Sequence, residues 1–382
     1  MANIEEYIKW RGDITFRERP FNEVDNLIFS EIAYVDLDDV IPQRGSKDAM
    51  SMEEAAEIYF SKHTDEELLA RNTVTKMAPF LFREAAKSNR FKNVGLGGFV
   101  NLIDETTDTQ FAVMVFTIPD RSVYIAFRGT DDTIVGWKED FIFSVSSATR
   151  GQKMAADYLN HFGLERRKIR VGGHSKGGNF AVYASAFCNP RIRKKIFEIY
   201  SNDGPGFIKD ITETDEYKEI LPKIKSIVPE SSVIGMLLNN EYDHKVIKSS
   251  GNMAHQHDPL SWEVLGESFV LAESLSESSS LLDTAITNWI SSFDDSEKEE
   301  FINTLFNTFS STGATTFEEL QKNIPGNLVE MFKNISSLPK EEQLNFGKVI
   351  GGLIKSGADA IKNKNTFSKM KGETKNVDKK RG

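Results

Sequence analysis

The chain has 382 residues, of which 39% are hydrophobic and 27% charged, enough for a sizeable core in one large or two modest domains. Its formal net charge of −10 argues against a general nucleic-acid binder, because neutralising phosphates requires a basic surface. The single cysteine, Cys188, excludes a disulfide framework and a cysteine-rich metal site, and we expect it to be a small buried residue. The first residues lack the basic and apolar stretches of a signal peptide, and no apolar run is long enough to span a bilayer. These features predict a cytoplasmic protein.

The first 95 residues are predicted to be a helical segment that packs on the main domain. Residues 24–34 have the apolar spacing of a helix, and residues 51–87 form a longer helical region with one apolar face. Ser51, followed by Glu53 and Glu54, is predicted to cap the start of that region.

The period of the hydrophobic pattern changes near residue 97. Runs of β-branched and aromatic residues, separated by turn residues, predict strands at 98–103, 110–118 and 122–127. A helix at 149–162 is then followed by further strands that begin at 169, 195, 224 and 244. A strand–helix alternation after a meander predicts an α/β fold with a mainly parallel central sheet flanked by helices, and we assign it to residues 96–270.

The last third of the chain has a different character. Residues 271–361 show helical periodicity without a strand signal, and their final helix carries an apolar stripe from Phe346 to Ile361. Residues 362–382 are rich in lysine and nearly free of apolar side chains, which predicts disorder. Two interpretations stay open: the stripe docks on a protein surface with a solvated tail, or stripe and tail bind an anionic membrane surface peripherally.

The residues from Gly173 to Gly177 match the G-x-S-x-G nucleophile elbow, with Ser175 at the apex of a turn between a strand and a helix. Glycines two before and two after the serine let strand and helix approach closely, and positive φ is cheap only for glycine. We interpret His174 as a packing residue that points away from the reaction. Lys176 is expected to be a solvated residue of the first helical turn, with contact to an anionic substrate as the alternative.

A serine nucleophile needs a base, which is nearly always histidine. In an α/β-hydrolase the order along the chain is serine, acid, histidine, which leaves three histidines after Ser175. We favour His257, in a loop after the last predicted strand, with His255 as the main alternative. His244 begins a predicted strand and is expected to be structural.

The acid of the triad is predicted to be Asp203, which ends the strand after the elbow at the carboxyl edge of the sheet. Glu230, after the next strand, is the alternative acid, followed by Asp243 and Asp258.

An oxyanion hole needs two backbone N–H groups. Lys176, directly after the nucleophile, is expected to supply one. The second is expected from the loop at 127–130, where Gly129 allows close approach and Thr130 offers its N–H and its hydroxyl.

Taken together, these residues are similar to the motifs of known families. The segment 126–130, then Trp137 and Asp140, then 173–178 resemble the class 3 (fungal-type) lipase branch of the α/β-hydrolases. More closely, residues 1 to about 270 resemble a bacterial α/β-hydrolase family that has no assigned substrate; the motifs concerned lie at 10–16, 20–25, 173–178, 202–206 and 256–258.

The resemblance implies an α/β-hydrolase fold, Ser175 as nucleophile, an oxyanion hole at Thr130 and Lys176, and His257 as base. One departure concerns the acid. Class 3 lipases usually carry it in an Asp-x-Val segment on the strand after the one that ends at Asp203, whereas this chain has serines at 231 and 232 there, preceded by Glu230.

The sequence therefore predicts an esterase-like or lipase-like serine hydrolase that cleaves a small-molecule or lipid ester through an acyl-enzyme. No cofactor and no metal are expected, and acyl transfer instead of hydrolysis stays open. The alternative function is a non-catalytic binding or scaffold protein that has lost its acid and uses the helical C-terminal region for an interaction.

Overall fold

The structure, a computed structural model, describes only part of the chain. The described residues are 2–43, 49–71, 73, 75–104, 109–130, 142–143, 148–162, 168–232, 234–251, 253–276, 295–310, 312, 336, 340 and 343–344. Trp137, Asp140, the apolar stripe at 346–361 and the tail at 362–382 lie outside them.

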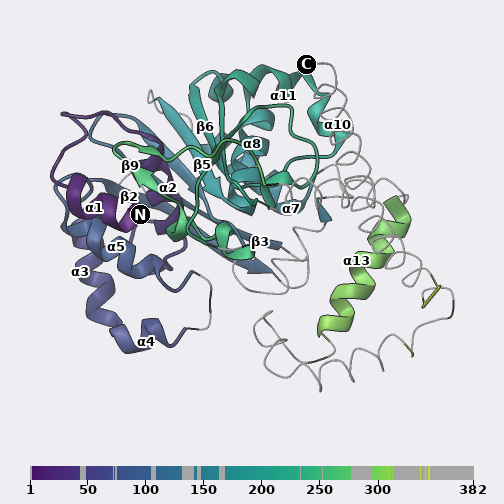
Figure 1. The fold of residues 1–382 in the computed structure, drawn as a ribbon, viewed down its shortest axis with the longest axis horizontal. Helices are drawn as coiled ribbons and strands as arrows, with labels where there is room; N and C mark the ends of the chain where they lie inside the picture. Colours follow the sequence, from purple (N-terminus) through teal and green to yellow (C-terminus); the bar gives the residue numbers. More distant parts are fainter. Residues whose placement is uncertain are drawn as a thin grey trace, which may run out of the picture.

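A central sheet of eight strands organises the described residues, and the strands stand in the sheet in the order of the sequence. Figure 1 shows the sheet with helices packed around it. They are β1 (Met50–Ser51), β2 (Gly95–Asp104), β3 (Thr109–Thr117), β4 (Val123–Phe127), β5 (Ile169–His174), β6 (Ile196–Asn202), β7 (Ile224–Pro229) and β8 (His244–Ile247). Strands β1 to β4 are antiparallel neighbours, and β4 to β8 are parallel. This mostly parallel sheet flanked by helices is an α/β-hydrolase fold, as the sequence predicts.

One face of the sheet is covered by the connections between the parallel strands. Because such crossovers are right-handed and the strands follow one another in order, their helices all fall on the same face. They are α7 (Arg150–Phe162), α8 (Lys176–Phe187), α9 (Pro190–Arg193), α10 (Lys209–Thr212) and α11 (Asp215–Ile220). A buried cluster that includes Phe127, Val171 and Phe180 fills the space between these helices and the sheet.

In the described part of the chain, no crossover helix lies on the opposite face, which is covered by the N-terminal helices (Figure 1). They are α1 (Ile4–Arg11), α2 (Glu23–Ile32), α3 (Met52–Lys62), α4 (Asp65–Leu69) and α5 (Ala78–Lys87). Helix α2 packs on β4 and β5, with nine of its residues buried. Its Phe29 ring stacks on Phe116 of β3 with 4.4 Å between centroids, so α2 belongs to the main hydrophobic core.

The predicted cap at Ser51 is confirmed. The Ser51 hydroxyl accepts from the Glu54 backbone N–H, and the Glu54 carboxylate accepts from the Ser51 N–H, which satisfies two backbone donors at the start of α3. Asn22 and Asp25 form the same reciprocal box at the start of α2.

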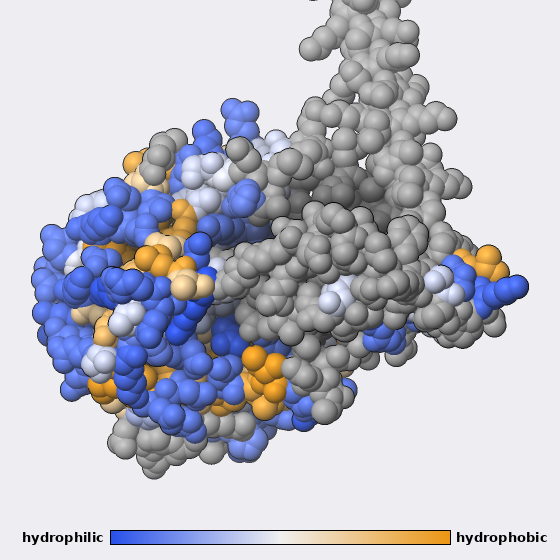
Figure 2. Space-filling model, turned by 90° about the horizontal axis from the view of Figure 1, so that it is seen from below, coloured by the Kyte–Doolittle hydropathy of each residue, from blue (hydrophilic) through white to orange (hydrophobic). Residues whose placement is uncertain are grey.

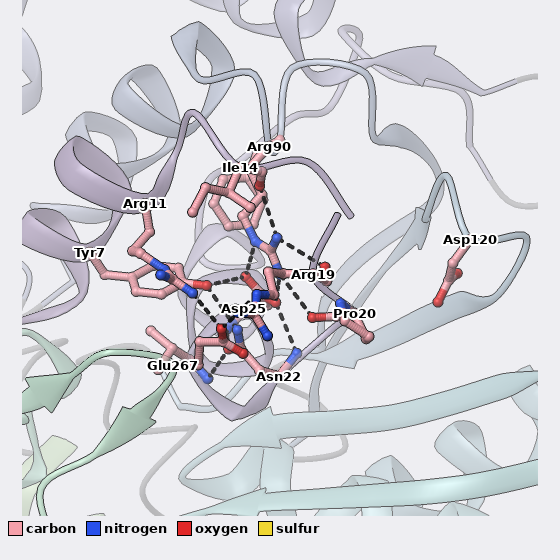
Figure 3. A network of polar contacts seen from close by, with 12 residues as sticks. Tyr7, Arg11, Ile14, Arg19, Pro20, Asn22, Asp25, Arg90, Asp120 and Glu267 are labelled. Carbon is pink, nitrogen blue, oxygen red and sulfur yellow. Dashed lines mark hydrogen bonds and ion pairs between the residues drawn. The ribbon is translucent and has the colours of Figure 1, made fainter. Parts of the chain in front are cut away.

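A buried ion pair fastens the loop before α2 (Figure 3). Arg90 donates two hydrogen bonds to the carboxylate of Asp25, at 2.8 and 2.6 Å, and both side chains are almost completely buried. The remaining guanidinium hydrogens reach the carbonyl oxygens of Ile14, Arg19 and Pro20. Burial raises the pKa of Asp25 and the arginine opposes this shift. One side chain thus holds the loop, α2 and the end of α5 together.

Short elements complete the described chain. They are the 3₁₀ turns η2 (Leu221–Lys223), η3 (Ile234–Met236), η4 (Met253–His257) and η5 (Pro259–Ser261), the hairpin β9 (Val264–Leu265) and β10 (Ser268–Phe269), and α13 (Asp295–Ser310). Helix α13 lies in the region 271–361 that was predicted to be helical, and its Ile302 and Phe306 are buried. At the start of that region the prediction is wrong, because residues 271–276 are not helical and Leu271 forms a β-bridge with Ile247. Cys188 is buried as expected, and burial raises the pKa of its thiol to about 11.

The surface of the described residues is mainly hydrophilic in the view of Figure 2, with separate smaller hydrophobic areas. Within the described residues, no helix has both the length and the apolar character that crossing a membrane requires.

Candidate active site

Ser175 lies at the junction of β5 and α8 in a strained backbone conformation. Its φ of 56° and ψ of −132° are unusual for a residue with a side chain and cost on the order of 1–3 kcal/mol. The Ser175 N–H donates to the carbonyl of Asn202 on β6, and the Ser175 carbonyl accepts from Gly178, both at 2.9 Å. Because both backbone groups are bonded, the turn is held, and the serine side chain sits at the carboxyl edge of the sheet with 8% of the residue exposed.

The two glycines of the elbow are needed for space. A Cβ atom on Gly173 would lie 2.4 Å from the carbonyl oxygen of Phe127, and one on Gly177 would lie 2.1 Å from the same oxygen. The sequence argument also gave these glycines a positive φ, and this part is wrong. The positive φ of the elbow belongs to Ser175 itself.

His257 and Asp203, far apart in the sequence, form a hydrogen-bonded pair. Nδ1 of His257 lies 2.6 Å from Oδ2 of Asp203, whose residue is completely buried. The other carboxylate oxygen, Oδ1, accepts from the hydroxyl of Ser232 at 2.5 Å and from the N–H of Gly235 at 3.2 Å. Both oxygens are therefore held, and the carboxylate fixes the orientation of the imidazole.

The alternative acid lies elsewhere. Glu230 is half-buried at the end of β7, where its backbone pairs with Ile247 and Ser276. Ser231, which stands where class 3 lipases carry the acid, donates its hydroxyl to Ser276. Its neighbour Ser232 instead supports Asp203. The structure thus brings Asp203, and not Glu230, to the histidine ring.

The alternative bases are also separated from this pair. His255 is exposed in η4. His244 lies in β8 with Nδ1 2.8 Å from the hydroxyl of Ser226, and burial lowers the pKa of its ring. These surroundings agree with the structural role that was expected of His244.

The loop that carries His257 is fixed through Gln256. The side-chain oxygen of Gln256 accepts from the N–H of Ser231 at 2.8 Å, and its backbone carbonyl accepts from the indole of Trp262 at 2.9 Å. These contacts tie the turn η4 to β7 and to the buried ring of Trp262.

The loop predicted to supply the oxyanion hole lies against the elbow. A Cβ atom on Gly129 would lie 3.1 Å from the Cβ of Ser175 and 2.6 Å from the carbonyl of His174, so only glycine fits there. Thr130 follows, half-buried, as the last described residue of its segment. On the other side, Lys176 is the first residue of α8, directly after Ser175.

The side chain of Lys176 differs from the expectation. It is completely buried rather than solvated, and its ammonium group donates to Oε1 of Gln110 at 3.3 Å. The expected solvated position of this side chain is therefore wrong.

Sequence reasoning missed a link between α2 and the elbow. Asn26 on α2 and Asn202 on β6 exchange side-chain hydrogen bonds of 2.8 and 3.1 Å, and the Asn202 amide also donates to the carbonyl of Gly173. An asparagine facing the core from the middle of a helix was the available signal, because a buried amide requires polar partners.

The packing interpretation of His174 is incomplete. Its Nδ1 lies 3.2 Å from the hydroxyl of Tyr34, and its Nε2 lies 2.9 Å from the carbonyl oxygen of His257. Burial, with His257 adding to it, holds the pKa of His174 well below its usual value, so the ring is neutral. Glu31 Oε1, 3.8 Å from Nδ1, has no hydrogen-bond partner among the described residues, and its pKa is raised well above the usual value by burial, with Asp258 adding.

The described residues contain no group of three or more histidine, cysteine, aspartate or glutamate side chains that could hold a metal ion.

The sequence of this chain matches the model of a known family. Residues 85–307 match the family model described as Mbeg1-like. The chain is similar to a solved structure described as the crystal structure of M37 lipase, with 17% sequence identity over 46% of this chain and 71% of that chain and a TM-score of 0.33. No curated protein sequence matches the chain.

Proposed function

This chain belongs to the Mbeg1-like family, and we propose that it is a serine hydrolase that cleaves carboxylic esters through an acyl-enzyme. The observation that carries the proposal is the contact of 2.6 Å between His257 and the buried Asp203, made beside a strained serine elbow. In a triad the acid must hold the histidine in one tautomer and stabilise its cation, and this contact provides both.

The reaction begins with attack of the Ser175 hydroxyl oxygen on the ester carbonyl carbon. Because Nδ1 of His257 donates to Asp203, Nε2 is the nitrogen that takes the serine proton. The carbonyl oxygen becomes an oxyanion, which accepts hydrogen bonds from the backbone N–H of Lys176 and from Thr130. When the intermediate collapses, the ester C–O bond breaks and the alcohol leaves with the proton held on His257.

The acyl group now on Ser175 is removed by the same groups. His257 takes a proton from water, the resulting hydroxide attacks the acyl carbon, and the acid leaves as the serine recovers its proton. An alcohol in place of water would give acyl transfer. The substrate that we propose is a small-molecule or lipid ester, and no cofactor or metal is required.

The alternative function, a non-catalytic scaffold, assumed that the acid of the triad is lost. The hydrogen bond from His257 to Asp203 counts against that assumption, because it supplies the group that the scaffold hypothesis takes to be missing.

Ser175→Ala tests the proposal in the full chain. We expect turnover of p-nitrophenyl butyrate to fall by at least about 10³-fold and labelling by a fluorophosphonate probe to disappear, with the melting temperature preserved. Ser61→Ala is the matched control, since Ser61 is an exposed serine on α3 whose hydroxyl bonds, within the described residues, only to the carbonyl of Ile58 in the same helix. Equal labelling of Ser175→Ala and the wild type would refute the assignment of the nucleophile.

A further inference from the structure

His174 connects the nucleophile elbow, the N-terminal region and the base. It directly precedes Ser175 at the end of β5 and is 5% exposed. One ring nitrogen contacts the hydroxyl of Tyr34, just after α2, and the other contacts the backbone carbonyl of His257. The rings of the two histidines pack with 4.5 Å between centroids.

The partners of His174 fix its tautomer. A carbonyl oxygen can only accept, so Nε2 of His174 must carry the proton and donate to His257. Nδ1 is then unprotonated and accepts from the hydroxyl of Tyr34. The neutral ring therefore satisfies both contacts at once, in agreement with the lowered pKa that its burial causes.

These contacts hold His257 at two points. Asp203 binds the ring at Nδ1, and His174 binds the main chain at the carbonyl oxygen. The first contact alone would fix the direction of the ring and leave the position of its Cα to the loop. The second, together with the contacts of the neighbouring Gln256, ties the main chain of His257 to the residue next to Ser175.

We propose that His174 is a positioning residue for the reaction, which sets the distance between Ser175 and His257 by holding the main chain of the base. The inference rests on the proposed hydrolase function. In this role His174 neither fills space in the core nor transfers a proton. Tyr34 orients the imidazole of His174 through the hydrogen bond to Nδ1.

The test compares three single variants in the full chain. His174→Phe keeps a ring for packing but cannot donate, and His174→Gln retains an amide N–H that can reach the carbonyl of His257. His161→Leu is the matched control, because His161 is an exposed histidine on α7. The measurements are kcat and KM for p-nitrophenyl butyrate, the rate of fluorophosphonate labelling, and the melting temperature.

We expect His174→Phe to lower kcat and the labelling rate by about 10- to 100-fold, as a small misplacement of a catalytic group does, with KM within about two-fold. His174→Gln should recover most of the loss, and His161→Leu should match the wild type. Wild-type kcat in His174→Phe would overturn the proposal. Equal losses in the Phe and Gln variants would also overturn it, because they would indicate a structural role alone. If His174→Phe does not fold, His174→Leu takes its place.

A second readout separates this proposal from the hydrolase function. If the wild type shows no turnover or labelling that depends on Ser175, the hydrolase proposal fails, and the low-field proton resonance of the His257–Asp203 hydrogen bond decides the positioning role. The resonance is identified by its loss in Asp203→Asn. It should keep its chemical shift and width in His174→Gln and should shift and broaden in His174→Phe, where the main chain of His257 loses a contact. An unchanged resonance in the Phe variant would overturn the inference.

Discussion

Replacing Asp203 by asparagine removes the charge of the acid and keeps its shape. An amide oxygen at the Oδ1 position can still accept from Ser232 and Gly235, so the turn should stay folded. The amide nitrogen must then face His257, where it can only donate. Nδ1 of His257 has to become the acceptor, and the ring proton moves to Nε2, the nitrogen that must take the proton of Ser175.

The size of the effect follows from the contact. With Nδ1 and Oδ2 2.6 Å apart, the centres of the two charges are about 4 Å apart, which at an effective dielectric constant of about 20 corresponds to about 4 kcal/mol of imidazolium stabilisation. At about 1.4 kcal/mol for each factor of ten, kcat should fall by about 10³-fold. The unfavourable tautomer adds to this loss.

The assay is kcat for p-nitrophenyl butyrate with the rate of fluorophosphonate labelling, and a melting curve confirms the fold. The matched control is Glu230→Gln, which makes the same chemical change at the alternative acid and should stay within about two-fold of the wild type. A kcat within ten-fold of the wild type in Asp203→Asn, or the large loss in Glu230→Gln, would show that the acid has been assigned wrongly.

Three further changes test the supports around the site. Because the pKa of Glu31 is raised in the folded protein, its carboxyl stays protonated there at pH values at which the unfolded chain, with the usual pKa of 4.5, has lost the proton. The wild type therefore loses stability as the pH rises, and Glu31→Gln does not. Relative to the wild type, the variant should gain up to about 1.4 kcal/mol per pH unit between pH 5 and pH 7. The same difference in melting temperature at both pH values would contradict this. Asn26→Ala removes the side-chain donor to Oδ1 of the buried Asn202, which should cost about 1–3 kcal/mol in urea unfolding and slow labelling of the serine. Arg90→Met leaves the buried carboxylate of Asp25 without its counter-charge and should lower the free energy of unfolding by about 3–5 kcal/mol. Adding Asp25→Asn in the same chain should restore most of this loss. Additive losses of the two changes in urea unfolding would argue against the pair.

The sheet and its helices could be predicted because their periodicity is strong. The strands before and after the elbow and helix α7 lie within a few residues of the predicted bounds. Helix α1 and the small strands β1, β9 and β10 were not foreseen, since each is short and owes its conformation to its neighbours in the fold.

The candidate site was predictable in its residue types and order, and less so in its contacts. The elbow motif marks Ser175, and the order of the chain selects the later histidines. The choice between Asp203 and Glu230 required the structure, because each of them follows a strand, β6 or β7, and both strands end at the same edge of the sheet. The burial of Lys176 could not be read from the sequence, because a charged residue at the start of a helix is usually solvated.

The strand order explains why the site extends beyond the matched family segment. Strands that follow one another in sequence place all crossovers on one face, so the other face needs a cover from elsewhere, and α2 provides it. That helix lies before residue 85, where the family match begins. From this position Asn26 reaches Asn202 behind the elbow, and Tyr34 reaches the ring of His174. The N-terminal residues therefore belong to the same folding unit as the sheet, and a chain that starts at residue 85 would lack both the cover of one sheet face and the support of the nucleophile.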